Sequence, residues 1–433
     1  MKVGFISLGC SKNLVDTEMC IGLVKEKGLT VVNDAREAEM IIINTCGFIE
    51  SAKEEAINTI LEMAEYKKRK CKYLVVMGCL VQRYKKELEK ALPEVDLFVS
   101  IDEYDNLSKK IDELINKKKT TANNLDYNKR VVTTGGKTAY LKIAEGCSNK
   151  CTYCAIPYIR GPFKSRKIED IIKEANILAE QGIEEIILVA QDTGRYGADI
   201  YGKPELEKLL KELCKIEKIK WIRFLYTYPE TITESLIELV KNQDKICNYF
   251  DIPIQHISNK VLKRMNRKTT GKDIKELVNK IRNKIPDVVL RTTLIVGFPG
   301  ETQEDFEELY KFVQSAKFDK LGVFTYSKED GTPAVKLDNH IHHATKKSRY
   351  NKIMNIQKEI SKKVLQERVG KVYKAIIDDK TFDNKYYIAR TYMDVPETDG
   401  VVYIKNNKEI QIGDFVNCKL TEVLEYDFYG ELI

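Results

Sequence analysis

Apolar residues in the first third of the chain form short continuous runs with amphipathic stretches between them. Runs of strand length lie at residues 3–8, 40–44 and 73–77. Helical periodicity, with apolar residues three or four apart, lies at residues 15–27, 52–68 and 83–92. This alternation predicts an α/β domain, in which a parallel sheet is covered by helices.

The middle of the chain repeats the same alternation. Six apolar runs are predicted as strands, at residues 140–144, 185–190, 221–226, 249–254, 288–296 and 321–326. Helices are predicted at residues 168–181, 205–218, 232–241, 274–284 and 304–316. Thr302 and Asp305 have the spacing of a capping box for the last of these. Six such units predict a closed or partial barrel, with its site at the carboxyl ends of the strands.

The pattern changes twice more along the chain. Residues 117–137 are polar, without an apolar period, so we expect a linker there. A helix is predicted at 351–365, followed by β-rich runs at 372–377, 386–391, 400–404 and 415–421 with turn residues between them. These runs predict a small antiparallel barrel. We therefore expect three domains, at residues 1–117, 133–363 and 366–433.

Composition narrows the class of protein. Of 433 residues, 43% are hydrophobic and 32% are charged, which is typical of soluble globular chains. The longest apolar runs, such as 40–43 and 186–190, are too short to cross a bilayer, so no membrane partner is expected. The cysteine count is odd, at eleven, and no apolar segment long enough for a signal peptide precedes Cys10. We therefore expect a cytoplasmic protein with metal or redox chemistry and no disulfide scaffold.

The strongest motif is Cys-x3-Cys-x2-Cys at Cys147, Cys151 and Cys154, here called the barrel cysteines. Such spacing also fits one face of a helix, but Gly146 and Pro157 oppose a helix here. Three cysteines without a nearby histidine are one ligand short of a closed zinc site. A 4Fe–4S cluster held by three cysteines would keep one iron open for another molecule.

Cys10, Cys46 and Cys79, here called the N-terminal cysteines, each follow a predicted strand directly and have a neighbouring glycine. The carboxyl ends of parallel strands share one edge of a sheet, so these three thiols could converge there. Any one of them could equally fill a core, because buried cysteine is common. The spacing leaves both a second three-cysteine cluster and a coincidence open.

Two weaker patterns are interpreted as solvated surface. His340, His342 and His343 have no cysteine or acidic partner at a metal-binding spacing, so a loop in solvent is expected. The basic run at 66–70 is expected to face water.

Residues 144–154 resemble the signature of radical S-adenosylmethionine enzymes, whose fold is a partial (β/α)6 barrel. With a preceding three-cysteine domain and a terminal small barrel, called TRAM, the whole chain resembles the methylthiotransferases of that family. Further matches point to the branch that modifies a ribosomal protein, at residues 9–16, 44–49, 191–193, 195–197, 326–327 and 331–334. Lys167 and Gly194 depart from this pattern without touching the cysteines.

The resemblance implies a transferase with two 4Fe–4S clusters. The barrel cysteines would hold the cluster that binds S-adenosylmethionine and generates a radical. That radical would take hydrogen from the β-carbon of an aspartate in a small-subunit ribosomal protein. The N-terminal cysteines would hold an auxiliary cluster presenting a methylated sulfur. Gln191, Gln255 and Gly297 end barrel strands, so we expect them near S-adenosylmethionine. An electron donor such as flavodoxin or ferredoxin is implied.

Three alternatives remain: methylthiolation of isopentenyladenosine in transfer RNA, a non-catalytic iron–sulfur electron carrier, and an RNA-binding protein with zinc in the cysteine sites. Charge bears on this choice. The formal total is +7, but residues 366–433 hold nine basic and thirteen acidic residues, a net charge of −4. An acidic barrel suits a basic protein partner better than RNA, so nucleic acid is expected only peripherally.

Overall fold

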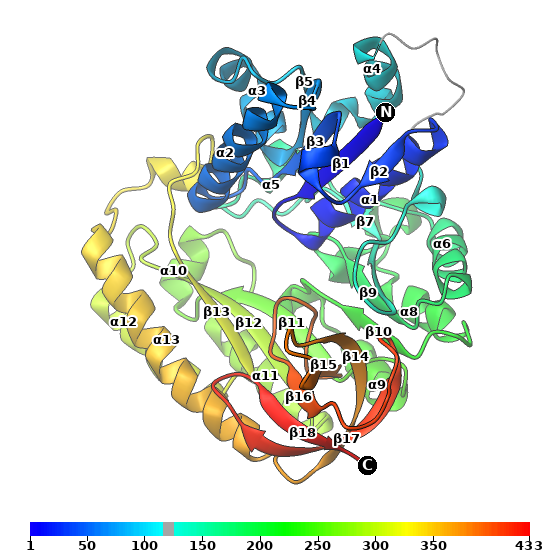
Figure 1. The fold of residues 1–433 in the computed structure, drawn as a ribbon. Coiled ribbons are helices and arrows are strands. Elements are labelled where there is room, and N and C mark those ends of the chain that lie inside the picture. Colours follow the sequence, from blue (N-terminus) through cyan, green and yellow to red (C-terminus); the bar gives the residue numbers. More distant parts are fainter. Residues whose placement is uncertain (116–124) are drawn as a thin grey trace.

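The computed structural model describes residues 1–115 and 125–433. Three units follow one another, namely a parallel sheet with helices, an open barrel of six strands and a small closed barrel (Figure 1). The predicted fold class is confirmed. The domain bound at 117 and the first part of the predicted linker at 117–137 lie outside the described residues. The other domain bounds remain predictions.

Five parallel strands form the N-terminal sheet, in the order β2-β1-β3-β4-β5. The strands are β1 (Lys2–Ser7), β2 (Thr30–Val32), β3 (Met40–Thr45), β4 (Tyr73–Gly78) and β5 (Leu97–Val99). The helices are α1 (Ser11–Glu26), α2 (Glu50–Ala64), α3 (Cys79–Ala91) and α4 (Leu107–Leu114). Apolar side chains of α2 and α3 cover one face of the sheet, and those of α1 and α4 cover the other. The central strand β3 is therefore buried at every position.

Helices α1 and α3 begin several residues before the predicted starts at 15 and 83. The first turn of α1 buries Lys12, Asn13 and Asp16, so it lacks the apolar period that marks the rest of the helix. As a result Cys79 opens α3, and Cys10 immediately precedes α1. These two cysteines lie at strand-to-helix junctions.

Six parallel strands form the open barrel. They are β6 (Thr138–Lys142), β9 (Glu185–Val189), β10 (Trp221–Phe224), β11 (Tyr249–Gln255), β12 (Val289–Val296) and β13 (Lys320–Thr325). Two three-stranded sheets, β10-β9-β6 and β11-β12-β13, join through an isolated bridge between Ile222 and Ile246. In the described part of the chain β6 and β13 do not pair, so the barrel is partial, as predicted.

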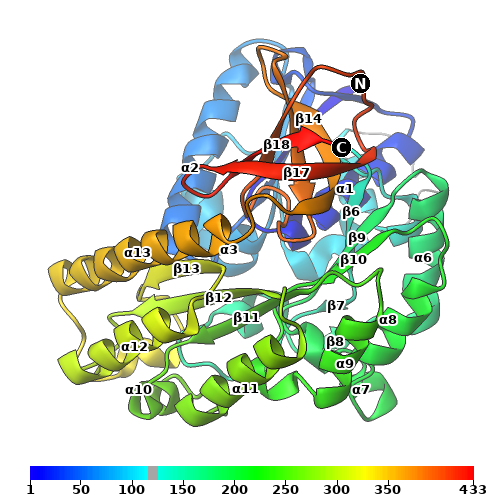
Figure 2. The same ribbon diagram turned by 90° about the horizontal axis from the view of Figure 1, so that it is seen from below.

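Helices line the outer side of these strands (Figure 2). The long ones are α6 (Ile168–Glu180), α8 (Leu206–Cys214), α9 (Glu234–Asn242), α11 (Gly271–Lys284), α12 (Gln303–Ala316) and α13 (His343–Gln366). Shorter elements are β7 (Ala144–Glu145), β8 (Lys164–Ser165), α5 (Ile156–Arg160), α7 (Ala198–Tyr201) and α10 (Asn259–Arg264). The capping box of Thr302 and Asp305 at α12 is confirmed. None of the described helices is long and apolar enough to span a membrane.

The small barrel closes in the order β14-β15-β16-β18-β17. Its strands are β14 (Val372–Lys380), β15 (Tyr386–Thr391), β16 (Val402–Lys405), β17 (Phe415–Val423) and β18 (Phe428–Leu432). All pairs are antiparallel except β16 with β18, which is parallel. The sequence did not predict β18, because Gly430 interrupts its apolar pattern. A side chain there would meet Val402, since a Cβ would lie 2.9 Å from its Cγ1.

The loop between β15 and β16 enters the open barrel at the amino ends of its strands. Tyr249, the first residue of β11, donates its hydroxyl to Asp399 at 2.7 Å. Lys320, the first residue of β13, pairs with Asp394 at 2.7 Å. This end of the barrel is therefore filled by the small barrel, while the carboxyl ends face the N-terminal sheet (Figure 1).

Candidate functional site

The N-terminal sheet lies against the carboxyl ends of the barrel strands. Lys12 at the start of α1 approaches Ala190, which follows β9, with 3.5 Å between Nζ and the carbonyl oxygen. The same ammonium stands 4.2 Å above the ring of Tyr226, just after β10. Farther along, Arg83 of α3 pairs with Glu329, beyond β13, at 3.0 Å. The sheet edge that carries the N-terminal cysteines is thus held over the barrel.

The barrel cysteines lie in a loop between β7 and α5, so the structure has no helix face here. Gly146 opens the loop with φ of +68°, and a Cβ at this position would stand 2.2 Å from the carbonyl oxygen of Pro162. Only glycine fits such a turn. Cys147 and Cys151 are buried and Cys154 is half-buried. Gly146 therefore permits the turn that opens this loop, and the three cysteines lie within the loop.

Polar groups with unused hydrogen-bonding capacity surround this loop. Burial raises the pKa of the Cys154 thiol to about 12. The sulfur of Cys151 lies 3.6 Å from the hydroxyl of Tyr228, whose ring is stacked 4.2 Å from the guanidinium of Arg267. Within the described chain, the Nε and Nη1 atoms of Arg267 are buried without a hydrogen-bond partner. Three soft sulfur donors beside an unsatisfied cation fit an iron–sulfur cluster together with an anionic ligand.

Asp192 anchors the loop of the barrel cysteines through a hydrogen bond to Asn149. Its carboxylate accepts a hydrogen bond from the Asn149 side chain at 2.8 Å and pairs with Arg195 at 3.1 Å. Burial nevertheless raises its pKa to about 6. Asn149 stands between Cys147 and Cys151, so this bond fixes the middle of the loop.

The N-terminal cysteines come together at one edge of the sheet. Gly9 has φ of +89°, and a Cβ there would lie 2.7 Å from the Cβ of Cys46, so the turn before Cys10 packs directly on Cys46. The thiol of Cys79 donates to Oδ1 of Asn13 at 3.6 Å, one turn into the helix that follows Cys10. Strand ends that are far apart in sequence thus present three thiols to one place.

Charges at this second set also fit a metal cluster. Burial raises the pKa of Cys46 and raises that of Cys79 to about 12. At Cys10 the cations of Lys12 and Arg160 outweigh burial, and its pKa lies below the ordinary value. In residues 1–115 and 125–433 no three His, Cys, Asp or Glu side chains are close enough to hold a single metal ion.

A cavity of about 440 Å³ lies beside the loops that carry the two sets of cysteines, although none of the six cysteines themselves lines it. Phe48 in its wall belongs to the loop after Cys46, and Tyr153 belongs to the loop of the barrel cysteines. Gln255, Ile295 and other residues from the ends of β11 to β13 complete the lining, which is mostly apolar. The cavity thus joins residues of both cysteine loops to the carboxyl ends of β11 to β13.

The three predicted cofactor-binding residues have different positions. Gln255 lines the cavity, with φ of +69° at the end of β11. Gln191 is half-buried in the bend after β9 and does not line the cavity. Gly297 follows β12, and a Cβ there would lie 2.4 Å from Cγ of Lys346 on α13. Its N–H donates to the buried carboxylate of Glu301, so this turn is closed by protein.

Three buried cations of the site were not predicted, namely Lys12, Arg160 and Arg267. Charged residues usually face solvent, so the sequence gives no direct sign that one is buried. Of the three, only Arg160 had a sequence feature that could have pointed to the site, because it ends the short helix that follows Cys154.

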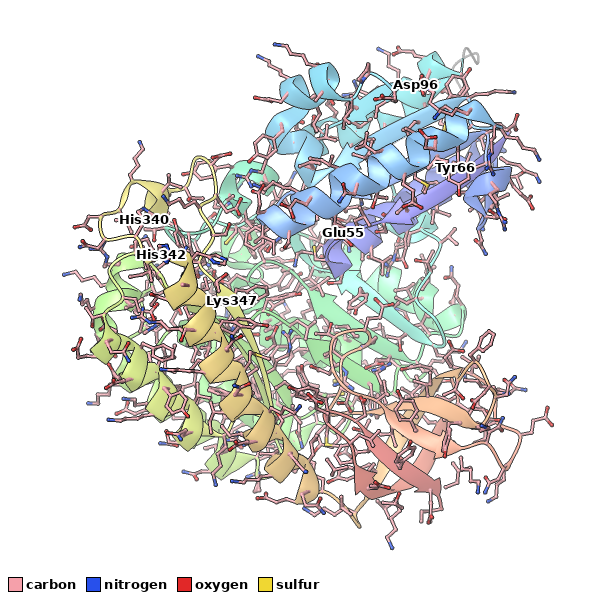
Figure 3. The ribbon with its side chains drawn as sticks, turned by 60° about the vertical axis from the view of Figure 1, so that its left-hand side comes forward. Glu55, Tyr66, Asp96, His340, His342 and Lys347 are labelled. Atoms are coloured by element: carbon pink, nitrogen blue, oxygen red, sulfur yellow. The ribbon has the colours of Figure 1, made fainter. Side chains whose placement is uncertain are left out.

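The two patterns interpreted as surface lie apart from the cavity lining (Figure 3). His342 and His343 are exposed at the start of α13, where His342 caps the helix, and His340 is half-buried with Nε2 at 3.1 Å from the Val335 carbonyl. In the basic run, Lys67 pairs with Asp96 at 2.7 Å, and residues 68–70 are exposed. The basic run agrees with its interpretation. The histidines agree with theirs only in part, because His343 belongs to helix α13 and His340 is half-buried.

Comparison with known proteins defines the class. The chain matches the Radical SAM superfamily at residues 141–313, an uncharacterized protein family, UPF0004, at 2–100 and the TRAM domain at 369–433. The fold resembles that of the radical S-adenosylmethionine methyltransferase TsrM of Kitasatospora setae, with a TM-score of 0.58 and 13% identity over 77% of this chain and 76% of that one. The protein is therefore a radical S-adenosylmethionine enzyme.

Full-length relatives narrow this class. The chain is 64% identical to the ribosomal protein uS12 methylthiotransferase RimO of Alkaliphilus oremlandii, over 100% of this chain and 99% of the relative. It is 51% identical to the RimO of Acetivibrio thermocellus, over 100% and 98%. The chain belongs to the RimO family of methylthiotransferases, and it is a transferase.

Proposed function

We propose that this enzyme transfers a methylthio group to the β-carbon of an aspartate in ribosomal protein uS12. The observation that carries the proposal is the cavity of about 440 Å³ with Phe48 from one cysteine loop and Tyr153 from the other in its wall. A substrate side chain bound there would contact a residue from each cysteine loop. The relatives named above act, by their names, on uS12.

In this proposal the barrel cysteines hold one 4Fe–4S cluster and the N-terminal cysteines hold a second. When bound, the clusters and S-adenosylmethionine supply the electron, the radical and the methylthio group. The chain places Cys10, Cys46, Cys79 and Cys147 each beside a glycine. It lines the cavity with the apolar side chains of Phe48, Ile295 and Phe324. Binding at both sites must displace protons, since burial keeps most of these thiols protonated in their absence.

Residues beside the barrel cysteines would bind S-adenosylmethionine. Arg267 has two buried donor atoms without a partner in the described chain, which suit a carboxylate. Gln255 supplies an amide at the cavity wall. Gln191 and Gly297 would act less directly, by shaping the ends of β9 and β12, since neither lines the cavity.

An electron donor such as flavodoxin or ferredoxin would approach the barrel cysteines from outside. All three line an open hollow of about 460 Å³ together with Lys150 and Tyr158, both of which are exposed. The positive charge of Lys150 in its lining suits an acidic redox protein. Lys150→Glu should slow reduction by flavodoxin at low salt and leave reduction by a small chemical reductant unchanged. Equal rates with flavodoxin would exclude this approach.

Mass spectrometry of small ribosomal subunits tests the proposed function. Cells carrying the native gene should show a methylthio group on one uS12 aspartate, and cells carrying a Cys46→Ala or Cys151→Ala variant should lack it. Unmodified uS12 in all cells, with methylthiolated adenosine in transfer RNA that depends on this gene, would instead establish the transfer RNA alternative. Absence of both modifications would overturn the proposal.

A further inference from the structure

Arg160 belongs to the barrel unit but projects its side chain into the N-terminal unit. It ends α5, the short helix after the barrel cysteines, and only 1% of its side chain is exposed. Its Nη2 atom donates to Oδ1 of Asn13 at 2.6 Å and pairs with Asp16 at 3.0 Å, both on α1. From its own unit, Glu145 pairs with Nη1 at 2.9 Å. The guanidinium is therefore held on both sides of the boundary.

Asn13 connects this guanidinium to all three strand ends that carry the N-terminal cysteines. Its Nδ2 atom donates to the carbonyl of Leu8 at 2.9 Å, just before the turn to Cys10, and to that of Thr45 at 3.1 Å, just before Cys46. Its Oδ1 atom accepts from the thiol of Cys79 at 3.6 Å and from Arg160. The asparagine is fully buried, so no water competes for these bonds.

The charge of Arg160 lies beside these thiols. Its Nη2 atom and the thiol of Cys79 share one acceptor, Oδ1 of Asn13, at 2.6 Å and 3.6 Å. In a buried site a fixed cation stabilises negative charge strongly, because little solvent screens it.

We propose that Arg160 of the barrel completes the N-terminal cysteine site, positioning its thiolates through Asn13 and setting the charge around the cluster they hold. The inference rests on the proposed function, since it assumes that these cysteines bind a 4Fe–4S cluster. Adding an electron makes a cluster more negative, and a nearby cation favours that state. Loss of Arg160 therefore lowers the reduction potential of this cluster.

The test uses the full chain with the barrel cysteines replaced by alanine, so that only the N-terminal site can hold iron. Into this parent we introduce Arg160→Gln, Arg160→Lys or the control Arg130→Gln. Arg130 is also a buried arginine that ties α1 to the barrel unit, through Glu18 at 2.6 Å and Glu174 at 2.9 Å. Iron content and a redox titration followed by electron paramagnetic resonance are measured for each variant.

We expect a more negative potential, or loss of iron, in Arg160→Gln, and values close to the parent in Arg160→Lys and Arg130→Gln. An unchanged potential at full iron content in Arg160→Gln would overturn the inference, as would an equal shift in Arg130→Gln. A parent without iron would instead refute the proposed function. If Arg160→Gln does not fold, the single variant Asp16→Asn is compared with the double variant Asp16→Asn/Arg160→Gln. In both of these, Lys142 stays paired with Glu145. The double variant should then have the more negative potential, and equal potentials would again overturn the inference.

Discussion

At the scale of single residues, His256 illustrates how burial fixes a protonation state. The imidazole is fully buried, its Nδ1 accepts the N–H of Ser258 at 3.0 Å, and burial lowers its pKa to about 3. The unfolded chain binds a proton near the ordinary pKa of about 6.5 and the folded chain does not. The contribution of neutral His256 to the free energy of unfolding is therefore fully present above about pH 6.5, and it is lost as the pH falls toward 3.

We expect this single group to remove about 2 kcal/mol from the free energy of unfolding between about pH 8 and pH 5. In His256→Asn the amide oxygen can accept the same N–H, and this part of the pH dependence should vanish. Thermal unfolding of both forms across this pH range provides the measurement. Parallel stability curves for the two forms would contradict the assigned protonation state.

Residue types decided which parts of the site could be predicted. Cys147, Cys151 and Cys154 stand close together in a pattern that opposes a helix, so their shared turn was readable from the sequence. Lys12 and Arg160 were not, because their burial depends on two distant segments meeting, and neither residue type is buried by preference.

At the scale of elements, the junction of β4 and α3 depends on Gly78. Its φ is +107°, and a Cβ there would lie 2.4 Å from Oδ1 of Asn44 and 2.6 Å from the carbonyl oxygen of Thr45. Gly28 also has a positive φ, of +69°, but a Cβ there would meet nothing within 4 Å. Gly78 therefore combines a backbone conformation that only glycine adopts, with ψ of −159°, with steric overlap, whereas Gly28 has the positive φ alone.

Gly28→Ala should cost about 1 kcal/mol, the strain of a left-handed residue. Gly78→Ala should cost several times more and should also lower iron binding, since Cys79 follows directly. Unfolding temperature and iron content after anaerobic reconstitution measure both effects. Equal costs for the two variants, with full iron content in each, would show that the junction tolerates a side chain.

Element starts and short edge strands were the features that the pattern missed. The first turn of α1 buries polar side chains against the barrel, so no apolar period marks it. Strands β2 and β5 have three residues each, too few for a periodic signal. In β18, Gly430 takes a position where the pattern expects an apolar side chain. Long buried strands such as β3 were predicted almost to the residue.

At the scale of the whole molecule, a buried ion-pair cluster joins the two barrels. Arg390 of β15 pairs with Glu185 of β9 at 2.7 Å, and Glu185 also holds Arg223 at 2.6 Å, with every side chain at most 1% exposed. The loop between β15 and β16 could not be predicted as a filler of the open barrel, because its polar turn residues are also typical of solvent-facing loops.

Arg390→Met should destabilise the protein by about 3 kcal/mol, because it removes one partner of a buried charge. The small barrel should then be cut more rapidly in limited proteolysis. Lys358→Met is the control, since Lys358 of α13 also reaches the small barrel, at Glu425, but through an exposed pair worth at most about 1 kcal/mol. Equal proteolysis of the two variants would place the main attachment elsewhere.

The iron content of the full chain, reconstituted without oxygen, tests the central claim that the chain carries two three-cysteine cluster sites. The account predicts about eight irons per chain, and about four when either the N-terminal or the barrel cysteines are replaced by alanine. About four irons in the native chain, unchanged by replacing the N-terminal cysteines, would contradict it.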